Sequence, residues 1–201
     1  VVDGKLIDVA PLEGLEDIVF DGTLYEAFNT SGGLGSLAET RGKGCEQINY
    51  KTMRYPGHCQ QMRLLMNDLK LNQDRATLKR ILENAVPQTL QDVVIVYAAV
   101  AGLQDGELRE ENYVNKIYPQ VIGGRLWSAI QVSTAAGITA VLDLVLTNPR
   151  KYRGFIAQEE FSLPDILGNR FGKHYASSGS KDISGQVVVA GRAGRQRKLR
   201  K

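Results

Sequence analysis

"DVVIVYAAVAGLQDGELREENYVNKIY" (residues 92–118) is the stretch that decides the fold. It holds two long runs rich in strand-forming residues, and Asp105-Gly106 joins them. An Asp-Gly pair accepts the positive φ angles of a type I′ turn, whose twist matches that of two antiparallel strands. We therefore predict a β-hairpin over residues 92–118. An apolar face with an unpaired edge on so long a hairpin would need cover, so we expect a homodimer through this sheet region.

The apolar stretch that follows, from Leu126 to Leu146, is nearly long enough to span a membrane. Polar residues interrupt it at Ser128, Gln131, Ser133, Thr134 and Asp143. Its many small residues would let another backbone approach closely. We interpret it as a long buried central helix packed on the sheet, and not as a membrane span.

The rest of the chain predicts shorter elements. Strands are expected at residues 5–9, 17–20, 24–28 and 45–54, and helices at 58–69 and 75–85. A later helix should begin after Ser162 as N-cap, with Pro164 in its first turn and Asp165 as its third residue. The expected class is α+β: a mixed, largely antiparallel sheet covered by helices, with the long buried central helix.

Composition limits the functions that come into question. The chain has 201 residues, is 43% hydrophobic and has a net charge of only +3. Six of the last eleven residues are basic and none is acidic, so the positive charge resides in the tail. A nucleic-acid binder usually has a basic face on its folded body, so we do not expect a nucleic-acid partner. Cys45 and Cys59 are too few for a disulfide framework and lack zinc-ligand spacing, so no metal is expected. We expect reduced thiols in a cytoplasmic protein.

The N-terminus lacks the basic region and apolar core of a signal peptide. It begins abruptly within a strand-like run, which suggests a piece of a longer protein.

A glycine-rich loop, NTSGGL, is the first segment that suggests chemistry. It consists of Asn29, Thr30, Ser31, Gly32, Gly33 and Leu34. Its glycines would let the backbone approach a ligand, and the helix after it would direct free N–H groups toward an anion. The spacing lacks the third glycine of a dinucleotide fingerprint. The alternative is a simple turn at the start of a helix.

The second segment is NYKTMRYPGHC, residues 49–59. Arg54 would end a strand on the same face as Thr52, and Pro56-Gly57 would turn the chain so that His58 begins a helix. A guanidinium fork, a hydroxyl and helix N–H donors would then meet at one place, which suits a carboxylate better than a metal or a phosphodiester. The alternative is that Arg54 pairs with a surface acid and His58 merely begins the helix.

Four segments, taken in order, resemble the C-terminal domain of the saccharopine dehydrogenase family. They are FNTSGGLGSLAET (28–40), NYKTMRYPGH (49–58), ILENAVPQTLQDVV (81–94) and FSLPDILGNRFGKHY (161–175). The resemblance covers residues 1–175, which defines the expected domain. The basic tail, residues 176–201, has no counterpart in the family and its role stays open.

The resemblance implies a substrate-binding and dimerising half of an NAD(P)-dependent oxidoreductase. Members of the family act on the CH–NH bond of amino-acid-derived secondary amines, as in lysine metabolism, and include saccharopine reductases, carboxynorspermidine synthases and lysine 6-dehydrogenases. Their N-terminal Rossmann domain, missing from this sequence, binds NAD or NADP. Residues 1–201 alone should therefore be inactive and bind the dinucleotide weakly.

The resemblance also implies roles for individual residues. Arg54 and Tyr55, with Thr52, would grip the α-carboxylate of a small amino-acid substrate, and the loop Asn29–Leu34 would close on it from the other side. His58 is the local group that titrates near neutrality, so it is the candidate base, although the base could equally come from the missing domain. A second function stays open: a non-catalytic interaction module that retains the fold without a nucleotide domain.

Overall fold

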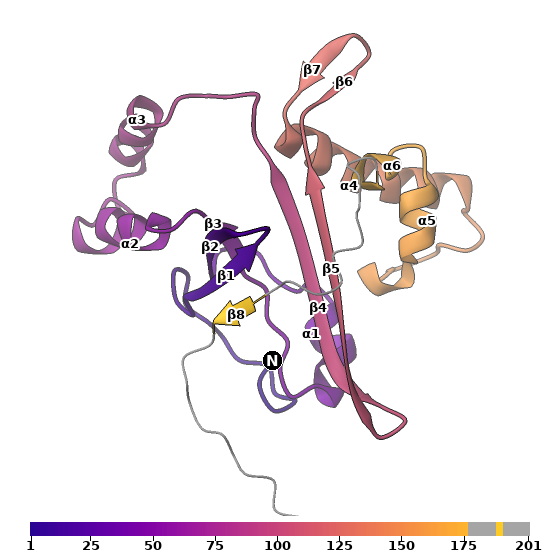
Figure 1. Cartoon of the computed structure of the whole chain (residues 1–201). Coiled ribbons are helices and arrows are strands. Elements are labelled where there is room, and N and C mark those ends of the chain that lie inside the picture. The colour runs from indigo at the N-terminus through magenta and orange to yellow at the C-terminus, as the bar shows by residue number, and fades with distance from the viewer. Residues whose placement is uncertain (177–187, 191–201) are drawn as a thin grey trace, which may run out of the picture. The chain divides into compact units, whose positions relative to one another are not determined.

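The computed structural model describes residues 1–176 and 188–190, and it divides into two compact units (Figure 1). Unit 1 comprises residues 1–86 and 185–201, and unit 2 comprises residues 87–184. The domain expected over residues 1–175 therefore includes parts of both units. The basic tail lies outside the described residues except for Val188–Ala190.

Unit 1 contains a four-stranded antiparallel sheet in the order β3-β2-β1-β8. The strands are β1 (Glu16–Phe20), β2 (Thr23–Phe28), β3 (Thr52–Arg54) and β8 (Val188–Ala190). Asp21 and Gly22, at φ of 48° and 73°, form the tight turn between β1 and β2. The strands predicted at 17–20 and 24–28 are confirmed.

Two other strand predictions in unit 1 are corrected. Residues 5–9 form no strand, and Lys5 makes only an isolated bridge with Val2. Of the stretch 45–54, only Thr52–Arg54 joins the sheet. The reason is the length of the neighbouring strand: β2 ends at Phe28, which pairs with Thr52, so the chain before Thr52 has no strand to pair with.

The helices expected at 58–69 and 75–85 are present in unit 1. The described helices of this unit are α1 (Leu37–Arg41), the 3₁₀ turn η1 (Gly42–Gly44), α2 (His58–Arg63), the π-helical turn η2 (Leu64–Asp68) and α3 (Arg75–Ala85). Asp74 caps α3 by accepting a hydrogen bond of 3.0 Å from the backbone N–H of Thr77. Pro87 lies just beyond the end of this helix, which a proline cannot continue.

Unit 2 begins with the predicted hairpin, formed by β4 (Val94–Gln104) and β5 (Glu107–Ile117). Asp105 and Gly106 have φ angles of 55° and 84°, as a type I′ turn requires. A second, short hairpin that the sequence did not predict follows: β6 (Gln120–Ile122) and β7 (Arg125–Trp127).

The long apolar helix is α4 (Ala129–Thr147). Ser128 and Gln131 form a capping box at its start, and the carboxylate of Asp92 accepts the N–H groups of Ala129 and Ile130 at 2.6 and 2.9 Å. Its buried residues form one stripe, namely Ala129, Val132, Ser133, Ala136 and Ala140. The other side is exposed, as at Ile138, so burial is limited to the small-residue stripe. By length and composition alone, α4 is also apolar enough to cross a membrane.

The small residues of α4 admit the last described helices of unit 2. These are the 3₁₀ turn η3 (Gln158–Glu160), α5 (Leu163–Gly168), which Ser162 caps as predicted, and α6 (Lys173–Ala176). The hydroxyl of Tyr175 donates a 2.6 Å hydrogen bond to the carbonyl of Ser133. A Cβ at Gly137 would lie 2.9 Å from that hydroxyl oxygen, so a larger residue there would force the Tyr175 side chain to move.

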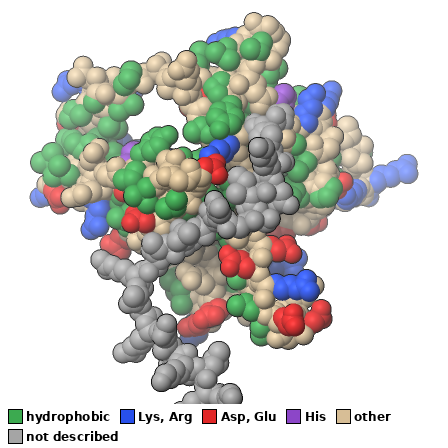
Figure 2. Space-filling model, in the orientation of Figure 1, with side chains coloured by type: hydrophobic (Ala, Val, Ile, Leu, Met, Phe, Trp, Pro, Cys, Tyr) green, Lys and Arg blue, Asp and Glu red, His purple; other side chains and the backbone are tan. Residues whose placement is uncertain are grey.

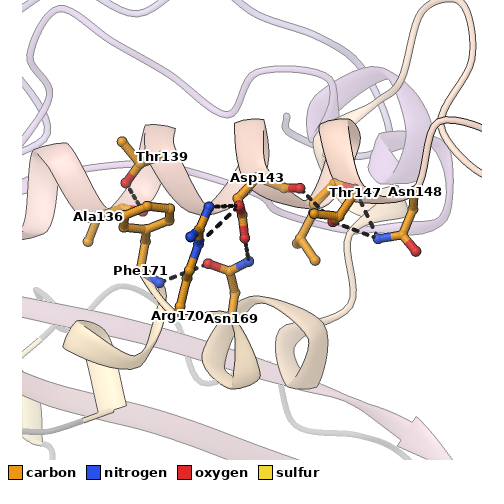
Figure 3. A network of polar contacts seen from close by, with 9 residues as sticks. Ala136, Thr139, Asp143, Thr147, Asn148, Asn169, Arg170 and Phe171 are labelled. Carbon is orange, nitrogen blue, oxygen red and sulfur yellow. Dashed lines mark hydrogen bonds and ion pairs between the residues drawn. The ribbon is translucent and has the colours of Figure 1, made fainter.

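Asp143 is the acidic residue of α4, and it ties this helix to the segment after α5 (Figure 3). Its Oδ1 accepts hydrogen bonds from Nε and Nη2 of Arg170 at 3.1 and 2.6 Å, and its Oδ2 accepts one from Asn169 at 2.8 Å. These bonds hold the pKa of Asp143 below its usual range.

The α+β class is confirmed, with helices and antiparallel strands in both units. The described strands lie in three separate sheets, one in unit 1 and two in unit 2.

Candidate functional site

The predicted site residues lie in unit 1, around β2, β3 and the start of α2 (Figure 1). Arg54 pairs with Glu26 across the two strands, and Thr52 pairs with Phe28. Directly opposite residues of an antiparallel pair point to the same face of the sheet. Arg54, Thr52 and Glu26 therefore share a face, as the alternation of the sequence predicted for Thr52 and Arg54.

Glu26 is the residue that the sequence analysis missed. Its side chain is buried, and its carboxylate accepts the backbone N–H groups of Gly57 at 2.9 Å and Cys59 at 2.5 Å. Gly57 turns into α2 with a φ of 94°, a conformation that favours glycine. The N–H donors at the start of α2 do bind a carboxylate, but it belongs to this chain. The sequence signal that could have indicated Glu26 was an acidic residue within the strand sequence LYEAF, most of which is buried.

Arg54 lies at the exposed end of β3. One guanidinium N–H group donates to the carbonyl of the neighbouring Met53 at 2.7 Å. Within residues 1–176 and 188–190, no hydrogen-bond partner holds its remaining N–H groups. Arg54 is therefore open to a ligand from solvent, and it makes no ion pair with Glu26 opposite it.

Tyr55 follows on the same exposed corner. Its side chain is 63% exposed, and its ring stacks on that of Tyr25 with centroids 5.5 Å apart. The stack covers one face of the Tyr55 ring and leaves most of the side chain exposed. Tyr25 alternates with Glu26 along β2, so the ring of Tyr55 lies on the opposite face from Arg54, although the two residues are adjacent in sequence.

His58 begins α2, and its ring stacks on Phe28 with centroids 6.1 Å apart. Partial burial, together with the positive charge of Arg54, lowers the pKa of His58, while Glu26 acts in the opposite direction. The pKa of His58 is lower in the folded chain than in the unfolded chain, so its contribution to folding stability is fully present at pH values above the unfolded pKa. This contribution is lost as pH falls through the folded pKa. A neutral imidazole beside a cation is the form that can accept a proton.

The glycine-rich loop lies at the other end of β3. Asn29 is buried, donates its backbone N–H to the carbonyl of Glu13 at 2.9 Å and accepts that of Leu12 at 2.7 Å. A Cβ at Gly32 would lie 3.8 Å from the ring of Tyr50. Since Phe28 pairs with Thr52, the loop starts beside Thr52.

The structure therefore brings Arg54 and His58 together on the face of Glu26, whereas Tyr55 stacks on Tyr25, whose side chain points to the opposite face of β2. The loop residues Thr30, Ser31, Gly33 and Leu34 follow Phe28, which pairs with Thr52 at the start of β3, whereas Arg54 lies at the end of this three-residue strand.

Cys59 belongs to the core under this corner. It is 1% exposed and packs with Leu12 and Phe28, against which Met62 and Met66 also lie. Its thiol donates to the carbonyl of Leu12 at 3.3 Å. Burial, and then the charge of Glu26, raise the pKa of this thiol, so it stays protonated and serves as a packed apolar group.

Other parts of the described chain offer less chemistry. Within the described residues, no group of three or more His, Cys, Asp and Glu side chains could hold a metal ion. A shallow cavity of about 370 Å³ lies in unit 2, lined by Val141, Ile156, Gln158, Phe161, Leu163 and Ile166. Its lining has no charged side chain that could bind a carboxylate.

A comparison with protein-family models finds no match for the chain, and no solved structure matches it significantly.

Proposed function

We propose that this chain is the substrate-binding and dimerising half of an NAD(P)-dependent oxidoreductase of the saccharopine dehydrogenase type. Its substrate would be an amino-acid-derived secondary amine, oxidised or formed at the CH–NH bond in the cytoplasm. Arg54 would bind an α-carboxylate of this substrate, Tyr55 would line the bound chain, and His58 would accept a proton.

One observation supports this proposal above the others: Arg54 has an accessible guanidinium group beside an imidazole of lowered pKa. A guanidinium fork matches a carboxylate with two parallel N–H···O bonds. An amine must be neutral when it loses hydride, and a neutral His58 could take up the proton. Binding and proton acceptance would then occur on one corner of the chain.

The described residues do not fit a dinucleotide. All of their paired strands are antiparallel, whereas the dinucleotide fold needs a parallel strand-helix-strand unit. NAD or NADP would therefore be bound by a nucleotide-binding domain outside residues 1–201, and this chain would contribute the substrate side of the reaction.

A second function is favoured by Glu26. Because this side chain already occupies the N–H donors at the start of α2, a substrate carboxylate could be held by Arg54 but not by the helix. A non-catalytic interaction module would not need the backbone N–H groups of α2 to be free for a substrate. In that case, the exposed Arg54 and Tyr55 would bind an acidic protein segment instead of a small molecule.

Replacement of Arg54 by Lys separates the charge from the guanidinium fork. We expect the Arg54→Lys enzyme, completed with its nucleotide-binding domain, to lose about 2–3 kcal/mol of transition-state stabilisation, the scale of a charge-assisted hydrogen bond in a closed site. The measurements are kcat/KM on secondary amines with two carboxylates and a thermal melting curve. Arg63→Lys in α2 is the matched control, because Arg63 is also exposed but lies on the helix beyond the corner.

Full activity of Arg54→Lys would contradict the carboxylate role. Unfolding of that variant would make Arg54 a structural residue. No turnover or binding of any dicarboxylic amine by the unaltered protein would favour the interaction module.

A further inference from the structure

The hairpin of β4 and β5 is long for a sheet of only two strands, with 11 residues in each strand. Residues 98–112, its outer part, are exposed throughout. A two-stranded hairpin is marginally stable by itself in water. The outer part of this hairpin therefore lacks the cover that a stable sheet normally has.

The two strands differ in charge. The sequence of β4, VIVYAAVAGLQ, has no charged residue and no proline, whereas β5 carries Glu107, Arg109, Glu110, Glu111 and Lys116. Figure 2 shows acidic and basic side chains together around the far end of this hairpin. Charged side chains protect an edge strand from pairing with another chain, and an uncharged edge without proline invites it. Pairing is thus disfavoured at β5 and favoured at β4.

The register identifies the backbone groups available at β4. Gln104 and Glu107 flank the two-residue turn, so they form a hydrogen-bonded pair, and such pairs alternate along the strands. Ala99, Ala101 and Leu103 fall between those pairs, and their backbone N–H and C=O groups therefore point away from β5. Within the described residues these groups have no other hydrogen-bond partner.

We propose that β4 pairs antiparallel with β4 of a second copy of this chain, around a two-fold axis at Ala101. Ala101 then pairs with its own counterpart, and Ala99 pairs with Leu103 of the second copy. About six backbone hydrogen bonds form, and the two hairpins become one four-stranded sheet. The proposal rests on the dimerising part of the proposed function, whereas the Arg54→Lys experiment tests its substrate-binding part, so the two can fail separately.

A second copy suits this strand better than a different partner. An uncharged strand presents nothing that an acidic or basic partner would complement, and two copies side by side bring no like charges together. The side chains at the axis are the small ones of Ala99 and Ala101, which leave room for a direct approach. Leu103, which is 78% exposed, would lie opposite Ala99 of the second copy and gain a neighbour there.

Ala101→Lys tests the pairing. Inside the hairpin the new lysine lies opposite Glu110, so the fold should persist, but at the axis it would face the same lysine of the second copy. We expect the dimer dissociation constant from sedimentation equilibrium to rise about tenfold or more. Leu108→Lys is the matched control, because it adds the same charge to the same face on β5. It should leave dimerisation unchanged.

Hydrogen exchange on the unaltered chain gives a test that needs no variant. Raising the protein concentration should protect the amides of Ala99, Ala101 and Leu103, while the amide of Gly102, which faces β5, should not change. A chain that stays monomeric at high micromolar concentration would overturn the proposal, even if a different protein were later found on this strand. Equal loss of dimer in Leu108→Lys and Ala101→Lys would also overturn it.

Discussion

Glu26 shows how one buried acid can decide both a local structure and the interpretation of a site. Its carboxylate satisfies two backbone N–H groups at the turn into α2, although 31 and 33 residues separate it from them. Buried backbone donors without partners are costly, so the strand β2 and the helix α2 depend on each other through this side chain.

We expect Glu26→Ala to lower the free energy of unfolding by about 1–3 kcal/mol, because the substitution leaves buried N–H groups at Gly57 and Cys59 without an acceptor. Urea denaturation measures the loss, and faster amide exchange at these two residues would locate it. Glu13→Ala is the control, since that side chain is exposed on the loop before β1. A loss no larger than that of the control would show that water replaces the carboxylate at no cost.

The sequence predicted the residues of this corner better than their arrangement. Arg54 and His58 do lie together, because they are close in sequence and Pro56-Gly57 turns the chain between them, whereas Tyr55 stacks on Tyr25 on the other face of β2. The partner of the helix donors could not be predicted, because Glu26 reaches them only after β2 and β3 have paired. The same holds for Asp92, which caps α4 from 37 residues away.

Among the elements, those whose signal is local were predicted well. The turn at Asp105-Gly106, the N-cap Ser162 and the range of α3 depend on neighbouring residues, and all three are confirmed. The strands expected at 5–9 and 45–51 depend on a partner strand that the sequence does not specify. Alternation of apolar and polar residues can predict which face of a strand is buried. The strand itself forms only where a neighbouring strand accepts and donates its backbone hydrogen bonds.

The turn of the long hairpin provides a test of its own. Gly106 has a φ of 84° and open space around it, so Gly106→Ala should cost only the strain of a left-handed residue, about 1–2 kcal/mol. Gly102→Ala is the matched control, because Gly102 in β4 also has open space but no positive φ. We expect no loss of stability there by thermal melting at low protein concentration. Equal effects of the two substitutions would contradict the type I′ turn.

The molecule as a whole is assembled out of sequence order. Unit 1 consists of residues 1–86 and the last residues of the chain, with unit 2 inserted between them. The strand β8, far from β1 in sequence, completes the sheet beside it. Nothing in the sequence indicated that Val188–Ala190, within the segment described as a basic tail, would pair with a strand of the N-terminal region.

This arrangement predicts what a chain ending at Ala176 would lose. Phe20 and Thr23 flank the Asp21-Gly22 turn as a hydrogen-bonded pair, so the amides of Asp17 and Val19 point away from β2 and toward β8, while that of Ile18 points toward β2. Without β8, we expect faster hydrogen exchange at Asp17 and Val19 and unchanged exchange at Ile18. Ile18 thereby serves as a control within the same strand. Uniformly faster exchange along β1 would mean that β8 is needed for the whole sheet, and no change at all would mean that β8 does not pair with β1 in solution.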